Sequence, residues 1–392
     1  MSNAPSADAP TQSLLKRIDW TNTLFIGGYH LALFILLPIY LMDTMPSWTL
    51  ILGSWALWTL SLMAITTGYH RLYSHRTYNT NRWIESVLLF FGTMATQGSV
   101  LQWSSDHRMH HKHVDSDNDP YNVEKGFWHA HMLWMFTGRR EVHERWVHDL
   151  IKDPVLRFQH KHFAVLMVAA NAVAVLGLWA LTGDLLGAFV IGFLLRLFLV
   201  HHCTWFINSL AHMWGSKPYS TEHSAVNNFI LSFLTFGEGY HNYHHTFAGD
   251  YRNGVRWYQF DPPKYVIWIL NKFGLARDLK QVNHLTIRRK LIKADLDMLV
   301  AHVKSLGQHH HDVLVHRAEE MAAELTAKYT ALKTASDAYQ DAKKRKDEEM
   351  VVLRARIKEL KQSLGSDLNR WKDFVNETLE MKPALEPARQ RA

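Results

Sequence analysis

The sequence predicts an all-α membrane protein. We expect four transmembrane helices in two hairpins, a cytosolic helical cap with a histidine-rich site for two metals, and a C-terminal amphipathic or coiled-coil helix. Three observations predict this fold. Four apolar stretches are long enough to cross a bilayer. Three histidine clusters lie outside them, all on one predicted side of the membrane. The last quarter is strongly charged, with apolar residues at helical spacing.

Composition excludes several classes of site. The chain has 392 residues, a net charge of +7 and a single cysteine, Cys203. One cysteine cannot form a disulfide framework or ligate an iron–sulfur cluster. The basic residues flank membrane-length segments, so we attribute the positive charge to an inward-facing surface and expect no nucleic-acid partner.

The first hairpin is predicted over residues 22–42 and 47–66. Residues 1–20 form a polar tail that we expect to be disordered, with no cleaved signal peptide. Lys16 and Arg17 precede the first span, whereas the turn Asp43–Pro46 has no lysine or arginine. The positive-inside rule therefore places the N terminus and the first histidine cluster in the cytosol.

Residues 70–160 are polar and are expected to be cytosolic. Within them, Trp83–Met94 is apolar but too short to span, which indicates a helix at the membrane interface. Asp115–Pro120 is predicted to be a turn; it lacks the glycine and terminal glutamate of a calcium-binding EF-hand loop.

A second hairpin is predicted over residues 163–181 and 185–206. Its outer turn, Thr182–Asp184, again has no lysine or arginine. Arg196 lies inside the last span. Buried charge in a span is either functional or a structural contact within the bundle, and both interpretations stay open for this residue.

The histidine clusters have the spacing of metal ligands. His107, His110 and His111 are related as i, i+3 and i+4, and so are His241, His244 and His245, so that each trio shares one face of a helix. The third cluster is the pair His70 and His75. Any one of them alone fits a hydrogen-bonded interfacial histidine equally well. Together, eight imidazoles are too many for one ion and suit two neighbouring metals.

The C-terminal extension, residues 291–392, is predicted to contain a long amphipathic helix. Its apolar stripe is formed by residues three and four apart: Leu353, Ile357, Leu360, Leu364, Leu368, Trp371 and Val375. This helix could serve self-association or partner docking, or it could be a solvated tail. We interpret His309–His311 as incidental, because it lacks spaced partners.

The histidine motifs and their flanks resemble the integral-membrane fatty acid desaturases, and most closely the acyl-CoA Δ9 (stearoyl-CoA) type. The flanks are Thr-Gly-Tyr-His-Arg-Leu-Tyr-Ser-His-Arg-Thr-Tyr, Trp-Ser-Ser-Asp-His-Arg-Met-His-His-Lys and Gly-Glu-Gly-Tyr-His-Asn-Tyr-His-His-Thr-Phe. Thr204–His212 is similar to the family segment that contributes a ninth histidine. The resemblance covers roughly residues 20 to 285 and makes residues 21–290 a membrane desaturase domain.

The resemblance implies an O2-dependent enzyme that introduces a cis double bond, at Δ9, into a saturated C16–C18 acyl chain. Two irons are implied, because zinc, which binds the same imidazoles and can replace iron in a preparation, has no redox chemistry. Asn208 would reach one iron through water. The implied ligands are His70, His75, His107, His110, His111, His212, His241, His244 and His245.

The resemblance also implies substrate contacts. Gln97, Trp103 and Thr204 match the residues that bend the acyl tunnel, and Asp106 joins the substrate-binding set. Trp58 and Leu62 precede His70 by two to three helical turns, so we expect them at the far end of the tunnel; the alternative is that both face lipid or a neighbouring helix.

One position departs from the family pattern. Animal acyl-CoA enzymes have a basic residue where this chain has Ser105, although Arg139 and Arg140 could still bind CoA phosphates. An acyl chain on a membrane lipid is therefore the main rival to acyl-CoA.

Electrons must come from a separate ferredoxin, rubredoxin or cytochrome b5-like donor, because the sequence contains no dinucleotide-binding fingerprint. Two other functions stay open: a related di-iron membrane hydroxylase or monooxygenase, and a non-enzymatic metal transporter, which would place its ligands within the spans. We expect a multi-pass protein with its active site and both termini in the cytosol, in a bacterial inner membrane rather than the endoplasmic reticulum.

Overall fold

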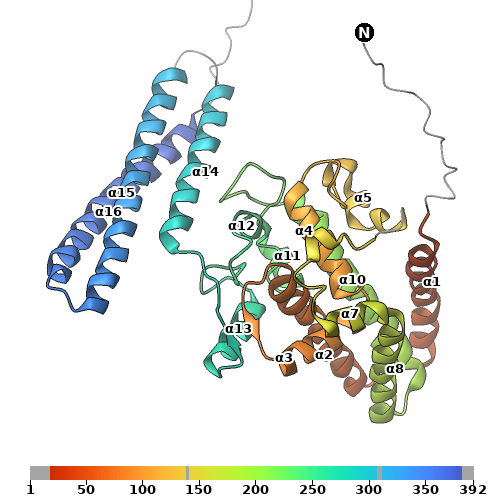
Figure 1. Ribbon diagram of the computed structural model, residues 1–392. Helices are drawn as coiled ribbons and strands as arrows, with labels where there is room; N and C mark the ends of the chain where they lie inside the picture. Colours follow the sequence, from red (N-terminus) through yellow and green to blue (C-terminus); the bar gives the residue numbers. More distant parts are fainter. Residues whose placement is uncertain (1–17, 138–140, 307–310, 382–392) are drawn as a thin grey trace, which may run out of the picture. The chain divides into compact units, whose positions relative to one another are not determined.

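The computed structural model describes residues 18–137, 141–306 and 311–381. It divides into two compact units, which are described separately: Met1–Gly215 with Ser224–Lys280, and Ser216–His223 with Gln281–Ala392. Helices dominate both (Figure 1). The first unit contains α1 (Trp20–Asp43), α2 (Trp48–Met63), η2 (Ala64–Ser74), α3 (Arg82–Met94), α4 (Val100–His113), η3 (Val123–Lys125), α5 (Phe127–His131), η4 (Leu133–Phe136), α6 (Glu144–Val147), α7 (Pro154–Lys161), α8 (Phe163–Thr182), α9 (Leu185–Phe189), η5 (Val190–Leu195), α10 (Arg196–Asn208), η6 (Leu210–His212), α11 (Phe229–Leu234), α12 (His241–Thr246) and α13 (Pro262–Lys272).

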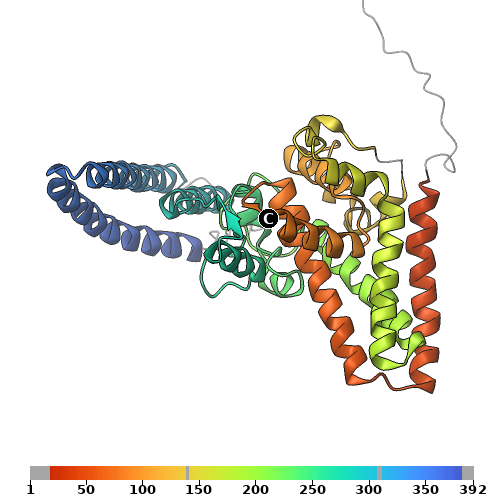
Figure 2. The ribbon, with the colours of Figure 1, turned by 60° about the horizontal axis from the view of Figure 1, so that its bottom comes forward.

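Four helical runs in the described part of the chain are long and apolar enough to cross a membrane: Trp20–Asp43, Trp48–Ser74, Phe163–Thr182 and Leu185–His212. They confirm the predicted fold class. Each hairpin turn is followed by a capped helix: Ser47 accepts a hydrogen bond from Leu50 N, and Asp184 accepts one from Gly187 N. The turns of the two hairpins lie at the same end of the bundle (Figure 2).

The fourth span is the centre of the bundle. The first span packs against it through a cluster that includes Tyr29, Leu33, Leu194 and Leu197. At the hairpin end, residues of all four spans meet: Tyr40, Leu50, Leu178, Ala188, Val190 and Ile191. The lipid-facing sides remain apolar, as a membrane environment requires.

The second and fourth spans continue beyond the stretches expected from hydropathy. The second, predicted to end at residue 66, runs through η2, a π-helix from Ala64 to Ser74. The fourth, predicted to end at residue 206, runs to His212. Hydropathy falls there because polar residues begin, but every residue of η2 is buried, so the backbone stays helical beneath the cap. This extension carries His70 into the interior.

The cap consists of short helices over the inner ends of the spans. A core formed by residues such as Tyr69, Tyr78, Leu101, Leu156 and Ile267 joins η2 to α4, α7 and α13. Within the described residues, the named strands are β1 (Asn79–Thr80) and β2 (Ala276–Arg277), paired antiparallel with Asn79 opposite Arg277. The predicted interfacial helix is α3, where Trp83 is exposed.

The C-terminal unit is a three-helix assembly of α14 (His284–Ser305), α15 (His311–Arg345) and α16 (Glu349–Glu380). The predicted amphipathic helix with the apolar stripe is α16. The extension as a whole contains several helices, and the chain breaks between α15 and α16 near Lys346, which has a positive φ of 57°. The stripe on α16, including Leu360, Leu364 and Trp371, packs within the chain against α14 and α15.

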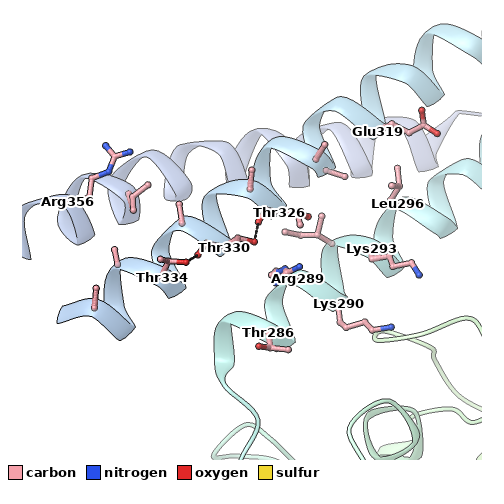
Figure 3. Close-up of a pocket in the computed structure, with 18 of the residues that line it drawn as sticks. Thr286, Arg289, Lys290, Lys293, Leu296, Glu319, Thr326, Thr330, Thr334 and Arg356 are labelled. Carbon is pink, nitrogen blue, oxygen red and sulfur yellow. Dashed lines mark hydrogen bonds between the residues drawn. The ribbon is translucent and has the colours of Figure 1, made fainter. Parts of the chain in front are cut away.

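A groove of about 1200 Å³ remains on this unit, lined by alanine and threonine of α15 between α14 and α16 (Figure 3). Disorder was predicted for residues 1–20, of which residues 1–17 fall outside the described residues, as do histidines 309 and 310. The prediction is wrong for residues 18–20: Ile18 forms a β-bridge with Thr137, Asp19 caps α1, and Trp20 begins that helix.

The packing of this unit predicts that shortening a side chain on α15 affects stability at a core position but not at an exposed one. Leu325, 1% exposed, lies in the three-helix core, and Val313 is 76% exposed. Leu325→Ala should destabilise the assembly by about 2–5 kcal/mol, because it leaves a cavity. Amide hydrogen exchange over α14 and α16 in the full chain should accelerate in Leu325→Ala and stay unchanged in Val313→Ala. Equal exchange in both variants would show that the three helices do not share a core.

Candidate metal centre

Nine histidines from distant parts of the chain converge beneath the cap. η2 contributes His70, and His75 follows directly after it. The two i, i+3, i+4 trios lie on α4 and α12, as their spacing predicted. His212, the ninth histidine suggested by the resemblance, ends η6.

The nine imidazoles form two groups. One comprises His70, His75, His107, His111 and His244; the other comprises His110, His212, His241 and His245. Within each group, the possible ligand atoms all lie within 4.8 Å of one another. All pairs with short contacts meet through Nε2: the His75–His107 distance is 2.7 Å and the His212–His241 distance is 3.1 Å. Each group can therefore direct several nitrogen lone pairs at one point.

Burial favours the neutral form of five of these rings. It lowers the pKa of His75, His107, His111 and His244 well below the usual value for imidazole, and neighbouring histidines lower it further. Burial, and after it the neighbouring histidines, also lower the pKa of His245 well below the usual value. A neutral imidazole has a free lone pair, which is the form that binds a metal.

Acidic and hydroxyl groups contact the outer nitrogens of three of these rings. Glu238 Oε2 lies 3.0 Å from His70 Nδ1, and Asp119 Oδ1 lies 2.9 Å from His110 Nδ1. His212 Nδ1 lies 2.6 Å from Ser224 Oγ, which in turn hydrogen-bonds Asp115. Such partners hold the proton on Nδ1 and direct the Nε2 lone pair inward, the usual arrangement around metal-binding histidines.

Glu238 is also held by a buried arginine. Arg71 NH2 lies 3.2 Å from Glu238 Oε1 and 2.8 Å from Asp261 Oδ1, and Asn253 Nδ2 donates to Glu238 Oε2. Burial raises the pKa of Glu238, but its contacts with His70 and Arg71 outweigh burial and lower the pKa to about 2. The carboxylate is thus ionised at neutral pH and fixes the His70 ring.

Sequence reasoning missed these supporting residues. Asp115 and Asp119 lie in the stretch interpreted only as a turn, and Glu238 stands inside the quoted third motif. The available signal was position: each acid lies within nine residues of a histidine cluster. No spacing rule shows, however, which ring an acid on a loop will meet.

The donor set fits two transition-metal ions. Imidazole nitrogen suits iron, zinc, copper and nickel. Neutral lone pairs, convergent Nε2 atoms and outer-nitrogen partners are the features that such a site requires. The groups adjoin one another, because the ring of His111 in the first group stacks on the ring of His245 in the second, with the ring centroids 4.2 Å apart.

A cavity of about 600 Å³ extends from this centre between the spans. His70, His107, His110 and His241 border it, and Ile65, Phe163 and Met167 supply apolar lining farther away. A volume of this size is typical of small-molecule sites. The cavity therefore offers an apolar ligand direct access to both histidine groups.

Most residues proposed to contact substrate line this cavity: Gln97, Trp103, Thr204, Asp106 and Leu62. Asn208, proposed to reach a metal through water, lines it as well. Gln97 Nε2 donates to Thr204 Oγ1 at 2.8 Å, and Trp103 Nε1 donates to Gln97 Oε1 at 3.3 Å. Asp106 accepts from Gln102.

The cavity lining does not include the other three candidates among the residues that the structure describes. Trp58 is not among the lining residues; its ring packs against Phe236, because the helix turns this face toward the cap. Arg139 and Arg140 lie outside the described residues. Ser105, at the position that departs from the family pattern, is buried and accepts a hydrogen bond from His143 N.

Comparison with known proteins agrees with this geometry. The fatty acid desaturase family matches residues 46–268, which include all nine histidines and most of the cavity lining. The chain belongs to the fatty acid desaturase family. It is 40% identical over 286 residues to the "Probable acyl-CoA desaturase" of Schizosaccharomyces pombe, and 33% identical over 288 residues to "Acyl-CoA desaturase 1" of Saccharomyces cerevisiae.

The share of each relative's length that aligns with this desaturase chain differs among the three proteins. The matches include 72% and 71% of this chain, but only 59% and 55% of the two yeast proteins. A third relative, "sn-1 stearoyl-lipid 9-desaturase" of Anabaena variabilis, is 35% identical over 274 residues, 68% of this chain and 96% of its own length.

The contact between Glu238 and His70 predicts an effect on metal retention. Glu238→Gln removes the charge that fixes the His70 ring, so metal affinity should fall about 10–100-fold. We would equilibrate the purified protein with buffered Fe²⁺ or Zn²⁺ and measure bound metal by mass spectrometry. Glu144→Gln, an exposed neutralisation, is the control and should bind as the parent does. If Glu238→Gln binds as much metal as the parent, Glu238 does not support metal binding through His70.

Proposed function

We propose that this chain is an O2-dependent fatty acyl desaturase that introduces a cis double bond, at Δ9, into a saturated C16–C18 acyl chain. The observation that carries the proposal is the pair of histidine groups bordering a cavity that runs between apolar spans. In the reaction, the acyl chain loses two hydrogens, and O2 with two electrons and two protons from a donor becomes two waters.

The proposed ligands are the nine histidines of the two groups, with Asn208 acting through water. Asn208 lines the cavity together with His110 and His241, which supports that role. Two bound irons would supply the O2-derived oxidant that an unactivated methylene requires, which zinc does not. The residues of the chain bind and orient the substrate around that centre.

The cavity walls orient the acyl chain. The hydrogen-bonded set of Gln97, Thr204 and Trp103 crosses the wall beside the histidines and would define the bend at which a methylene meets the centre. Apolar lining farther along excludes water from the rest of the chain. Binding in one register then determines the position of the double bond.

The acyl carrier has two supported candidates. The yeast relatives are named acyl-CoA desaturases, and the cyanobacterial relative is named a lipid desaturase. We propose acyl-CoA as the substrate, since the S. pombe protein has the highest identity among these three. The buried Ser105 leaves acyl-lipid as the alternative.

Two further functions are less well supported. A di-iron hydroxylase or monooxygenase could use the same centre, but the long apolar cavity with a fixed bend favours a reaction at one internal carbon. A metal transporter would place its ligands in mid-bilayer. Here His70 and His212 lie near the inner ends of their spans, and the other seven lie in the cap.

Partners and location follow from the same site. We propose a separate ferredoxin, rubredoxin or cytochrome b5-like donor; self-association through the C-terminal helices stays a prediction. The yeast and mammalian relatives favour the endoplasmic reticulum over the bacterial inner membrane expected from the sequence. A cytosolic active site and cytosolic termini remain our proposal for the orientation.

Replacing His244 tests the function. Its Nε2 lies 3.0 Å from His70 Nε2 and 2.9 Å from His111 Nε2, so His244→Ala should abolish desaturation and reduce bound metal. The control is His113→Ala, on α4 but outside both groups. The assay is expression in a host lacking the product, with mass spectrometry of double-bond position and acyl carrier. Full activity with one metal per chain, or an oxygenated product, would contradict the proposal.

Leu62 predicts the chain-length preference. It is 2% exposed and lines the cavity two helical turns before His70. Extra methylenes against this bulky wall would cost about 1–3 kcal/mol, so the parent should prefer sixteen carbons or fewer. Leu62→Ala should shift preference toward eighteen carbons, with the double bond still counted from the carboxyl end. Leu60→Ala, on the exposed face of the same helix, is the control; identical selectivity in both would place the cavity floor elsewhere.

A further inference from the structure

The turn between α3 and α4 holds a β-branched residue in a left-handed conformation. Thr96 has φ of 59° and follows Ala95, the last capping residue of α3. Glycine or asparagine is usual at this position, because a β-branched side chain crowds the backbone there. Such a conformation persists only where the surroundings fix it, and such strain is concentrated at functional sites.

Three buried side chains from the spans fix this turn. Arg196 NH1 donates to Met94 O at 3.3 Å. His201 Nε2 lies 3.2 Å from Ala95 O and 3.1 Å from Thr96 O. Asn171 Nδ2 donates to Thr96 Oγ1 at 3.4 Å. Consecutive backbone carbonyls and the hydroxyl of one strained turn are thus all bound by side chains of the third and fourth spans.

The same side chains are anchored to one another and to the first two spans. Arg196 also donates to Asn171 Oδ1, Ser61 Oγ and Gly192 O. The Nε2 of His201 faces two carbonyls, which only accept, so it must carry the proton. His201 Nδ1 then accepts from Tyr29 OH, 2.9 Å away. Tyr29 therefore fixes the tautomer that binds the turn.

The next residue in the chain is Gln97, which defines the proposed bend. Gln97 donates to Thr204, and Thr204 follows His201 by one turn of α10. Thr96, Gln97, His201 and Thr204 all line the cavity. Any movement of the turn consequently moves the bend relative to the histidine groups.

We infer that Arg196, Asn171, His201 and Tyr29 form a clamp of positioning residues that sets which carbon of the acyl chain is desaturated. This inference rests on the proposed function and deepens it. The clamp holds the Thr96 turn in its strained form, and the turn holds Gln97 against Thr204. Loosening the clamp lets the acyl chain bind in more than one register, so the double bond spreads to neighbouring carbons while the metal ligands stay in place.

The test uses one conservative change at two tyrosines of α1. Tyr29→Phe removes the hydroxyl that fixes the His201 tautomer. Tyr40→Phe removes a hydroxyl that donates to Asp184 at the opposite end of the helix, and it is the matched control. A second variant, Thr96→Gly, relieves the left-handed strain and deletes the hydroxyl bound by Asn171. Products of the full-length protein in membranes are analysed by mass spectrometry of double-bond position, with bound metal and melting temperature measured alongside.

Tyr29→Phe and Thr96→Gly should raise the share of neighbouring positional isomers about tenfold, since small misplacements strongly change reactivity. Bound metal should stay unchanged, and Thr96→Gly should melt no lower than the parent. Tyr40→Phe should keep the parental pattern. Three outcomes would overturn the inference without affecting the proposed function. They are the parental isomer pattern in both test variants, loss of all product in both, and an equal spread of isomers in Tyr40→Phe. A parent chain that makes no unsaturated product overturns the proposed function, and the inference with it.

Discussion

A buried imidazole can bind a metal only when it is neutral and its ring is fixed, and different parts of the membrane unit serve these two requirements. Burial lowers the pKa of rings such as His107 and His244. Glu238, Asp119 and the Ser224–Asp115 pair orient three others. The extended second and fourth spans are needed because they carry His70 and His212 into the same interior as the trios of α4 and α12.

The buried carboxylates in turn require buried cations. Arg71, fully enclosed, contacts both Glu238 and Asp261, and its NH1 donates to Tyr251 O. Removing one partner of such a set leaves an uncompensated charge, which costs about 3–5 kcal/mol. Arg71 follows His70 directly in the sequence, so one short stretch of η2 supplies both a ring of the centre and the counter-charge of the acid that orients it.

Local periodicity predicted much of this arrangement, and long-range contacts explain what it missed. The i, i+3, i+4 spacing depends only on helix geometry, so it placed both trios on helices before any fold was known. The inner ends of the spans were underestimated, because hydropathy reports lipid contact whereas η2 is buried in protein. The acids on loops were missed because no local pattern specifies which ring they meet. The stripe on α16 was recognised, but its partners, α14 and α15, emerge only from packing.

Arg71 and Arg196, both buried in the described part of the membrane unit, offset the cost of burying a charge in different ways. Arg71 lies among carboxylates, whereas Arg196, inside a span, is bound by neutral oxygens from Ser61, Met94, Asn171 and Gly192. An ionisable residue within a span is costly to bury, so it needs several polar partners there. The guanidinium of Arg196 reaches several acceptors at once, which a lysine could not do with the same geometry. Its location links the bundle to the strained turn rather than to the histidines. The fold therefore separates two structural roles: the Arg71 network holds the acid that contacts His70, and the Arg196 network holds the turn that borders the cavity.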